Sequence, residues 1–252
     1  MFIDTHCHIS KEYYDNIDNV ILDSKNNNVN KIIISGCEKE SIDESIEISN
    51  KYENVYLTIG FHPDQVDIVD SNDLEKLKKQ LISCKKIVGI GEIGLDYHYD
   101  KSKKEEQQIL FRKQLEIAEV LNLPVVIHSR DAVSDTINIL KDYKVHGVIH
   151  CFSGSLEVAN IYIKMGYKLG IGGVVTFKNS NLPETLKNID LENIVLETDS
   201  PYLTPHPYRG EKNSSKYIPI IAEKLSTIYN KDINYIAKKT TENAKNVFTK
   251  LV

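Results

Sequence analysis

The sequence predicts an α/β fold in which eight parallel strands form a single-domain (β/α)8 TIM barrel. Short apolar runs rich in β-branched residues recur along the chain and alternate with segments of helical periodicity. This pattern is typical of parallel strands joined by crossover helices. Eight runs are the number that closes such a barrel, and a length of 252 residues suits it. No linker rich in proline, glycine or serine divides the chain, so we expect one domain over residues 1–252.

Each predicted strand is a short apolar run, and each predicted helix fills the interval before the next run. In the clearest helix, over residues 104–122, Phe111, Leu115 and Ala118 lie on one stripe. An open doubly wound sheet would show the same alternation and remains the competing architecture. The predicted strands cover residues 2–6, 31–36, 55–60, 87–91, 125–128, 147–150, 167–171 and 194–197. The other predicted helices cover about 15–28, 40–51, 73–84, 132–141 and 156–165, with two more between 217 and 250.

Composition and charge restrict the class of protein. Hydrophobic residues make up 41% and charged residues 27%, and no apolar run approaches the roughly 18 residues of a membrane span, so we expect no membrane partner. The first residues lack the pattern of a signal peptide, and the four cysteines are scattered without a CxxC pair, which predicts reduced thiols in a cytoplasmic protein. A net charge of −5 argues against a protein that coats nucleic acid, but not against local binding of a few phosphates.

Two histidines separated by one residue, His6 and His8, close the first predicted strand. Residues two apart on a strand point to the same side, so both imidazoles are aimed at one place. Neutral imidazole binds Zn, Mn and similar ions well. The pair alone could also be two ordinary histidines, so its interpretation depends on the rest of the chain.

Four further candidate ligands follow later strands. Glu92 comes after the fourth predicted strand, His128 and His150 come at the ends of the fifth and sixth, and Asp199 comes after the eighth. In a barrel these positions share the C-terminal face, where active sites are built. Any one of them could be a hydrogen-bonded structural residue or a helix cap. Together with the histidine pair they favour two divalent ions, because a single catalytic zinc needs only about three protein ligands.

Arginine and aromatic residues lie on the substrate side of the predicted site. Two of the three arginines, Arg130 and Arg209, border the candidate ligands, and an arginine fork matches phosphate oxygens. His62 follows the third predicted strand and is a candidate substrate contact. Rings on these loops could stack on bases of single-stranded nucleic acid or simply pack over the barrel rim. They are Phe61, Tyr97, Tyr99, Phe152, Phe177, Tyr202 and Tyr208.

These motifs resemble the blocks of the TatD family of metal-dependent deoxyribonucleases, within the amidohydrolase-like barrels. Seven blocks match in order: FIDTHCH at 2–8, GFHP at 60–63, GEIGLDY at 91–97, IHSR at 127–130, HCFSG at 150–154, ETDSPY at 197–202 and RG at 209–210. The chain departs from the family at Asp64, where the family often has histidine, and at 213–215, where it often has Asn-Glu-Pro. Both departures fall in presumed substrate loops.

The resemblance implies a (β/α)8 barrel that holds two divalent metal ions (Zn, Mg or Mn). It places one ion on His6, His8, Glu92 and Asp199, and the other on Glu92, His128 and His150, with Glu92 bridging. It also implies hydrolysis of DNA phosphodiester bonds, commonly from the 3′ end of single strands. We therefore expect a monomeric deoxyribonuclease with single-stranded DNA as its partner.

In the mechanism that we expect, Glu92 and Asp199 are the catalytic carboxylates. Asp199 orients a water and takes its proton, while Arg130, Arg209 and His62 contact the substrate. One alternative keeps the metal centre but changes the bond, to an amide, lactone or aminoacyl ester. A second alternative is a metal-bound scaffold without catalytic activity.

Overall fold

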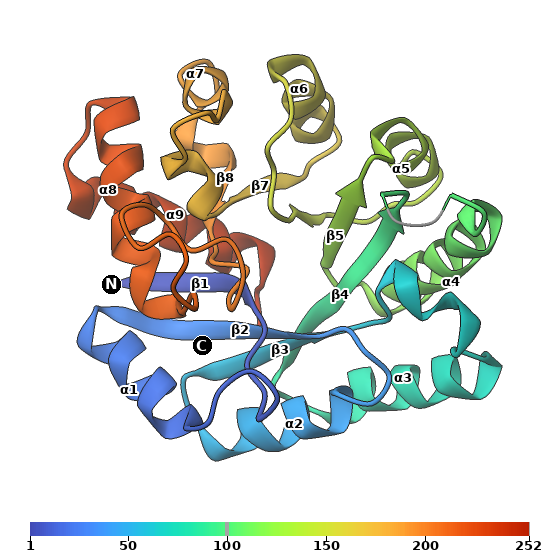
Figure 1. The fold of residues 1–252 in the computed structure, drawn as a ribbon. Coiled ribbons are helices and arrows are strands. Elements are labelled where there is room, and N and C mark those ends of the chain that lie inside the picture. Colours follow the sequence, from blue (N-terminus) through green and yellow to red (C-terminus); the bar gives the residue numbers. More distant parts are fainter. Residues whose placement is uncertain (99–100, 252) are drawn as a thin grey trace.

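The computed structural model describes residues 1–98 and 101–251, and it shows eight parallel strands in sequence order (Figure 1). Because each strand pairs with the next one along the chain, the doubly wound alternative, in which strand order reverses, is excluded. The strands are β1 (Phe2–Cys7), β2 (Val29–Gly36), β3 (Val55–Ile59), β4 (Ile87–Asp96), β5 (Val125–Arg130), β6 (Gly147–Ile149), β7 (Lys168–Ile171) and β8 (Ile194–Leu196).

The helices lie outside the strands, between consecutive strands and after β8 (Figure 1). All predicted helices are present, and the structure adds the short α7, which sequence periodicity did not indicate. Within the described part of the chain, no helix combines the length and the apolar character needed to cross a membrane. The helices are α1 (Ile17–Asn26), α2 (Ile42–Lys51), α3 (Ser71–Ser83), α4 (Lys104–Leu121), α5 (Val133–Leu140), α6 (Leu156–Lys164), α7 (Leu182–Leu186), α8 (Ile218–Tyr229) and α9 (Ile233–Val247).

The first and last strands meet and bring the sheet close to a complete barrel. The amides of Thr198 and Asp199 both donate to the carbonyl oxygen of His6, at 3.3 and 3.0 Å. Lower in the barrel, the Thr5 hydroxyl donates to the carbonyl oxygen of Leu196 at 2.9 Å. This seam places the end of β1 directly beside the segment that follows β8.

Two strands extend further than the sequence predicts. β4 continues to Asp96, so Glu92 lies within a strand and not after it. β5 continues to Arg130, two residues beyond the predicted end at His128. Glycine in this stretch suggested the end of a strand, but Gly94 instead allows β5 to approach closely. A Cβ atom at Gly94 would lie 2.0 Å from the carbonyl oxygen of His128.

A small apolar cluster under the site forms the floor of the barrel. Residues of seven strands, among them Tyr56 of β3, form this cluster together with Ala244 and Val247 of α9 and with Phe248, which follows α9. Three of its valines stand two residues before a polar residue of the site: Val126 before His128, Val148 before His150, and Val195 before Glu197. Because strand side chains alternate, the same faces that bury the floor present these polar groups above it.

Helix α4 fixes the loop after β3 through one buried amide. Gln114 is fully buried, accepts a hydrogen bond from the Phe61 amide at 2.7 Å and donates to the Phe61 carbonyl oxygen at 2.9 Å. The two bonds satisfy both ends of the side-chain amide, as a buried polar group requires. They hold the chain one residue before His62.

Candidate metal centre

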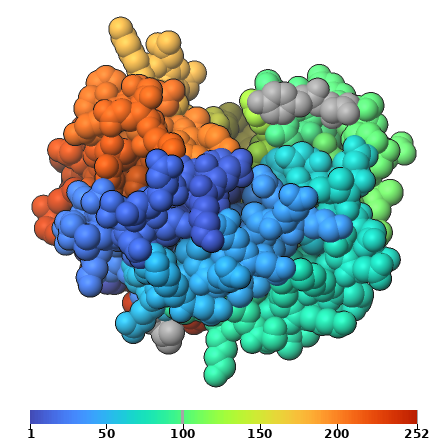
Figure 2. Space-filling model, turned by 60° about the horizontal axis from the view of Figure 1, so that its bottom comes forward, coloured from blue at the N-terminus to red at the C-terminus, as the bar shows by residue number. Residues whose placement is uncertain are grey.

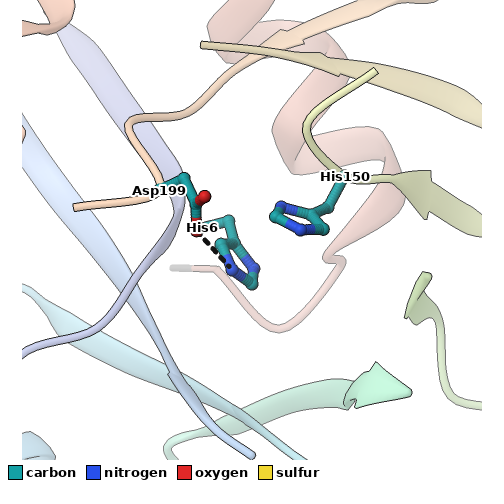
Figure 3. A group of neighbouring side chains, drawn as sticks. All are labelled: His6, His150 and Asp199. Atoms are coloured by element: carbon teal, nitrogen blue, oxygen red, sulfur yellow. Dashed lines mark ion pairs between the residues drawn. The ribbon is translucent and has the colours of Figure 1, made fainter. Parts of the chain in front are cut away.

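The end of β1 brings two imidazoles together, as the alternation of strand side chains predicts. The Nε2 atoms of His6 and His8 lie 3.2 Å apart. His6 is buried and His8 is half-buried. Figure 3 shows His6 between Asp199 and the ring of His150, whose centroid lies 4.1 Å from that of His6.

Glu92 lies at the centre of the cluster and contacts four imidazoles. One carboxylate oxygen, Oε1, lies 2.7 Å from Nδ1 of His128 and 3.0 Å from Nε2 of His150. The other oxygen, Oε2, lies 3.4 Å from Nε2 of His6 and 3.7 Å from Nε2 of His8. Each oxygen of one carboxylate thus faces a different histidine pair.

Asp199 completes the cluster from the other side of the seam. Its Oδ1 atom lies 3.6 Å from Nε2 of His6 and 3.4 Å from Nε2 of His8. Its backbone has a left-handed φ of 54°, a conformation that aspartate and asparagine adopt more readily than most residues. The structure therefore brings all six ligands that the sequence predicts into one cluster of mutual contacts.

The charges of the cluster depend on one another. Burial favours the neutral form of Glu92, but the adjacent His150 and His6 hold the pKa of its carboxyl well below the usual range. Burial and His150 lower the pKa of His6, yet the carboxylates of Glu92 and Asp199 outweigh them and raise it to about 9. Protons and cations therefore compete for the same atoms, and we expect metal affinity to fall as the pH is lowered.

Sequence reasoning missed three carboxylates that support the candidate ligands. Asp96 Oδ2 lies 3.1 Å from Nε2 of His128, and Glu197 Oε1 lies 3.4 Å from Nδ1 of His150. Asp4 accepts hydrogen bonds from the hydroxyl and amide of Thr198, at 2.6 and 3.0 Å, and burial raises its pKa to about 6. Strand alternation was the available signal, because each lies two or four residues from a candidate ligand.

Replacing Asp96 with asparagine is expected to weaken metal binding and activity about 10- to 100-fold. When Nε2 of His128 donates to this carboxylate, Nδ1, the atom facing Glu92, can offer its lone pair to a metal. Affinity measured by competition with a chelator, alongside kcat/KM, checks this. Unchanged affinity in the D96N protein would contradict the positioning role.

Gly170 on β7 is expected to be essential for the placement of Glu197. An added Cβ would lie 2.0 Å from Oε2 of Glu197, which is fully buried. We expect Gly170→Ala to destabilise the fold by about 1–3 kcal/mol and to lower activity by moving the support of His150. Denaturant unfolding measures the first effect. Gly172→Ala is the matched control, because its Cβ would meet no atom closer than 3.5 Å.

The predicted substrate contacts lie around the rim of the cluster. The His62 ring is 4.5 Å from that of His128, and Arg130 is exposed at the end of β5. Arg209 is exposed, with its guanidinium 4.0 Å above the Phe177 ring and a bond to the Thr204 carbonyl oxygen at 3.0 Å. His62 thus lies beside the His128 ring, and Arg130 follows His128 by two residues on the same strand. Arg209 instead contacts other loop residues, Phe177 and Thr204.

The loop aromatics divide into two groups. Packing over the rim accounts for Phe61, Tyr97 and Phe152, which are buried, and Phe177 is half-buried. Exposure remains high for two rings after β8, at 51% for Tyr202 and 39% for Tyr208. Tyr99 lies outside the described residues. In Figure 2 the orange segment after β8 borders a notch opposite the cyan and green segments that follow β3 and β4.

The chain is similar in sequence to known proteins. The family model described as TatD related DNase matches residues 3–249. The chain is 42% identical to an uncharacterized metal-dependent hydrolase, YabD, of Bacillus subtilis, over 98% of this chain and 99% of that protein. It is 31% identical to another, YcfH of Escherichia coli, over 98% and 95%.

Solved structures of TatD homologues have the same fold as this chain. The crystal structure of YjjV, a TatD homologue of Escherichia coli, superimposes with a TM-score of 0.93 at 30% identity, covering 98% of both chains. A TatD family hydrolase of Entamoeba histolytica gives a TM-score of 0.88 at 27% identity, over 98% of this chain and 97% of that one. With its barrel, its histidine and carboxylate cluster and these relatives, the chain belongs to the TatD family of metal-dependent hydrolases.

Proposed function

We propose that the protein is a deoxyribonuclease that hydrolyses DNA phosphodiester bonds, as a 3′→5′ exonuclease on single strands. The observation that carries the proposal is the Glu92 carboxylate, whose two oxygens each face a pair of imidazoles. Two adjacent cations at such a carboxylate would stabilise the attacking and the leaving oxygen when water displaces an ester oxygen from the phosphorus of a phosphodiester. The description of the matching family as TatD related DNase supports the same substrate.

The donor set fits two divalent ions. Ligand atoms of His6, His8 and Glu92 lie within 4.8 Å of one another, as do those of Glu92, His128 and His150. A third group within that distance, His6, His150 and Asp199, adds the aspartate. We assign one ion to His6, His8, Glu92 and Asp199 and the other to Glu92, His128 and His150. Divalent ions supply Lewis acidity at such a site, and nitrogen and oxygen ligands accept Zn, Mn or Mg.

Asp199 is the proposed general base. Its neighbours His6 and His8 outweigh the effect of burial and hold the pKa of its carboxyl below the usual range, so it is ionised at neutral pH. It is also less enclosed than Glu92, with 16% of its side chain exposed against 5%. This exposure lets a water that enters from solvent contact Asp199 and give up a proton to it, while Glu92 fixes the four imidazoles.

Arg130 and His62 are the proposed phosphate contacts on the β3 and β5 side, and Arg209 the proposed contact on the β8 side. Guanidinium groups match phosphate oxygens in a bidentate way and offset charge that develops during hydrolysis. The guanidinium of Arg209 lies over the Phe177 ring. We assign these three residues to substrate binding and not to the chemical step.

The test is a side-by-side assay of the purified protein, stripped of metal and reloaded with Mg, Mn or Zn. The substrates are single-stranded DNA labelled at either end, duplex DNA, an aminoacyl ester, a lactone and a cyclic amide. We expect metal-dependent shortening of single-stranded DNA from its 3′ end. Faster turnover of the ester, lactone or amide than of DNA would overturn the proposal in favour of another hydrolase activity.

A further inference from the structure

Two tyrosines, the exposed Tyr202 and the half-buried Tyr13, form a wall beside the candidate metal centre. The ring of Tyr202 lies 6.2 Å from that of His8, at an interplanar angle of 64°. The ring of Tyr13, in the loop after β1, lies 6.0 Å from that of Tyr202, and the two hydroxyls are 3.2 Å apart. Tyr202 is 51% exposed. A large ring is thus held in solvent next to a candidate ligand.

The wall is fixed to the seam of the barrel. The amide of Tyr202 donates to the Asp199 carbonyl oxygen at 2.9 Å. The fully buried side chain of Asn213 donates to the carbonyl oxygens of Tyr202 and Thr198, at 2.5 and 2.9 Å. These bonds connect the backbone under Tyr202 to the segment that carries Asp199, so the ring keeps its position relative to the site.

One lysine contacts the loop that carries Tyr13, although the whole chain is acidic. The ammonium group of Lys212 donates to the carbonyl oxygen of Tyr13 and lies 5.4 Å from the centre of the Tyr14 ring. A ring that offers its face and a nearby cation are the two elements with which proteins bind single-stranded nucleic acid. The ring stacks on a base, and the cation attracts the phosphate backbone.

We infer that Tyr202, supported by Tyr13, stacks on the base of the nucleotide next to the scissile bond. The inference rests on the proposed function and restricts its substrate to single-stranded nucleic acid. In a duplex both faces of an internal base are covered by its neighbours, so its face is not open to the ring. Tyr202 is a specificity-determining residue in this view, because it binds the base while other groups act on the phosphate.

The same loop offers a matched control. Tyr208 is also exposed, at 39%, but its ring is stacked on that of Tyr217, with centroids 5.0 Å apart and an interplanar angle of 23°. Among the described residues its ring contact is with Tyr217 and not with a candidate ligand, so removing it should not change base binding. Tyr202→Phe keeps the ring and removes only the hydroxyl.

The experiment compares wild type, Tyr202→Ala, Tyr202→Phe and Tyr208→Ala on two single-stranded oligonucleotides. One oligonucleotide is intact, and the other lacks the base next to the scissile bond. We expect Tyr202→Ala to raise KM for the intact strand about 10- to 100-fold with little change in kcat. The KM of the wild type should rise by a similar factor on the base-free strand. Tyr202→Ala should cause no further rise in KM on that strand, because the base that the ring binds is absent. Tyr202→Phe keeps the ring and should lie much closer to wild type than Tyr202→Ala, and Tyr208→Ala should resemble wild type.

The two levels of the argument fail differently. Two results with an active wild type overturn base stacking and leave the proposed function standing. In the first, Tyr202→Ala has an unchanged KM for the intact strand. In the second, Tyr202→Ala raises KM relative to wild type as much on the base-free strand as on the intact strand. Preference of the wild type for duplex DNA would overturn base stacking and the single-strand part of the proposed function, and would leave only the deoxyribonuclease activity. If wild type cleaves no DNA with any metal, the proposed function fails, and this inference fails with it.

Discussion

Glu92→Gln is expected to lower hydrolysis by about a thousand-fold or more and to reduce the metal bound per chain. The carboxylate of Glu92 contacts the imidazoles of His6, His8, His128 and His150, so it is the one group shared by both halves of the cluster. An amide keeps the shape of the side chain but removes its charge and replaces one acceptor with a donor. A loss of several kcal/mol of charge stabilisation corresponds to this rate effect.

The measurements for this variant are kcat/KM on single-stranded DNA, metal content and thermal unfolding. Glu157→Gln, an exposed change in the first turn of α6, is the control for loss of a glutamate charge. We expect a folded barrel, because the apolar floor below the site does not include Glu92. A folded Glu92→Gln protein with wild-type activity would show that the metal assignment is wrong.

The second large effect is expected for Asp199→Asn, with a loss of activity of about 100- to 1,000-fold. Asparagine accepts the left-handed backbone of this position, so the change tests the carboxylate and not the turn. The neutral amide cannot take a proton from water, and it offers the His6 and His8 imidazoles no negative charge. We expect kcat to fall more than KM rises.

Asp131→Asn is the control for this second variant. Asp131 is an exposed aspartate with the same backbone conformation, a φ of 53°, and its carboxylate pairs with the exposed His98 at 3.0 Å. We expect its activity to resemble that of wild type, because exposed ion pairs contribute little. Equal losses in both variants would attribute the effect to the turn and exclude a special role for the Asp199 carboxylate.

The sequence predicts most of the fold because its two signals are local. Apolar runs mark strands and helical periodicity marks helices, and both survive in the structure with small changes at the ends. The strand ends were less predictable. β4 continues through Gly91 and Gly94, where β5 approaches so closely that a side chain would clash. This close approach is a property of the packed barrel and cannot be read from the local sequence.

The candidate ligands were predictable for a different reason. They stand at or near the ends of parallel strands, and the topology of a barrel brings those ends together. Asp96, Glu197 and Asp4 were missed because a supporting carboxylate has no motif of its own and is recognised only through the group that it contacts. The exposure of Tyr202 and the stacking of Tyr208 also depend on which loop covers which ring.

The seam between β1 and β8 has a consequence for protein synthesis. His6 emerges from the ribosome early. Asp199, whose amide is one of the two that donate to the His6 carbonyl oxygen, follows 193 residues later. A nascent chain that lacks the eighth strand can hold neither the complete cluster nor the tyrosine wall. Hydrolytic activity should therefore arise in one step when translation reaches the end of the barrel, and fragments that stop earlier should be inactive.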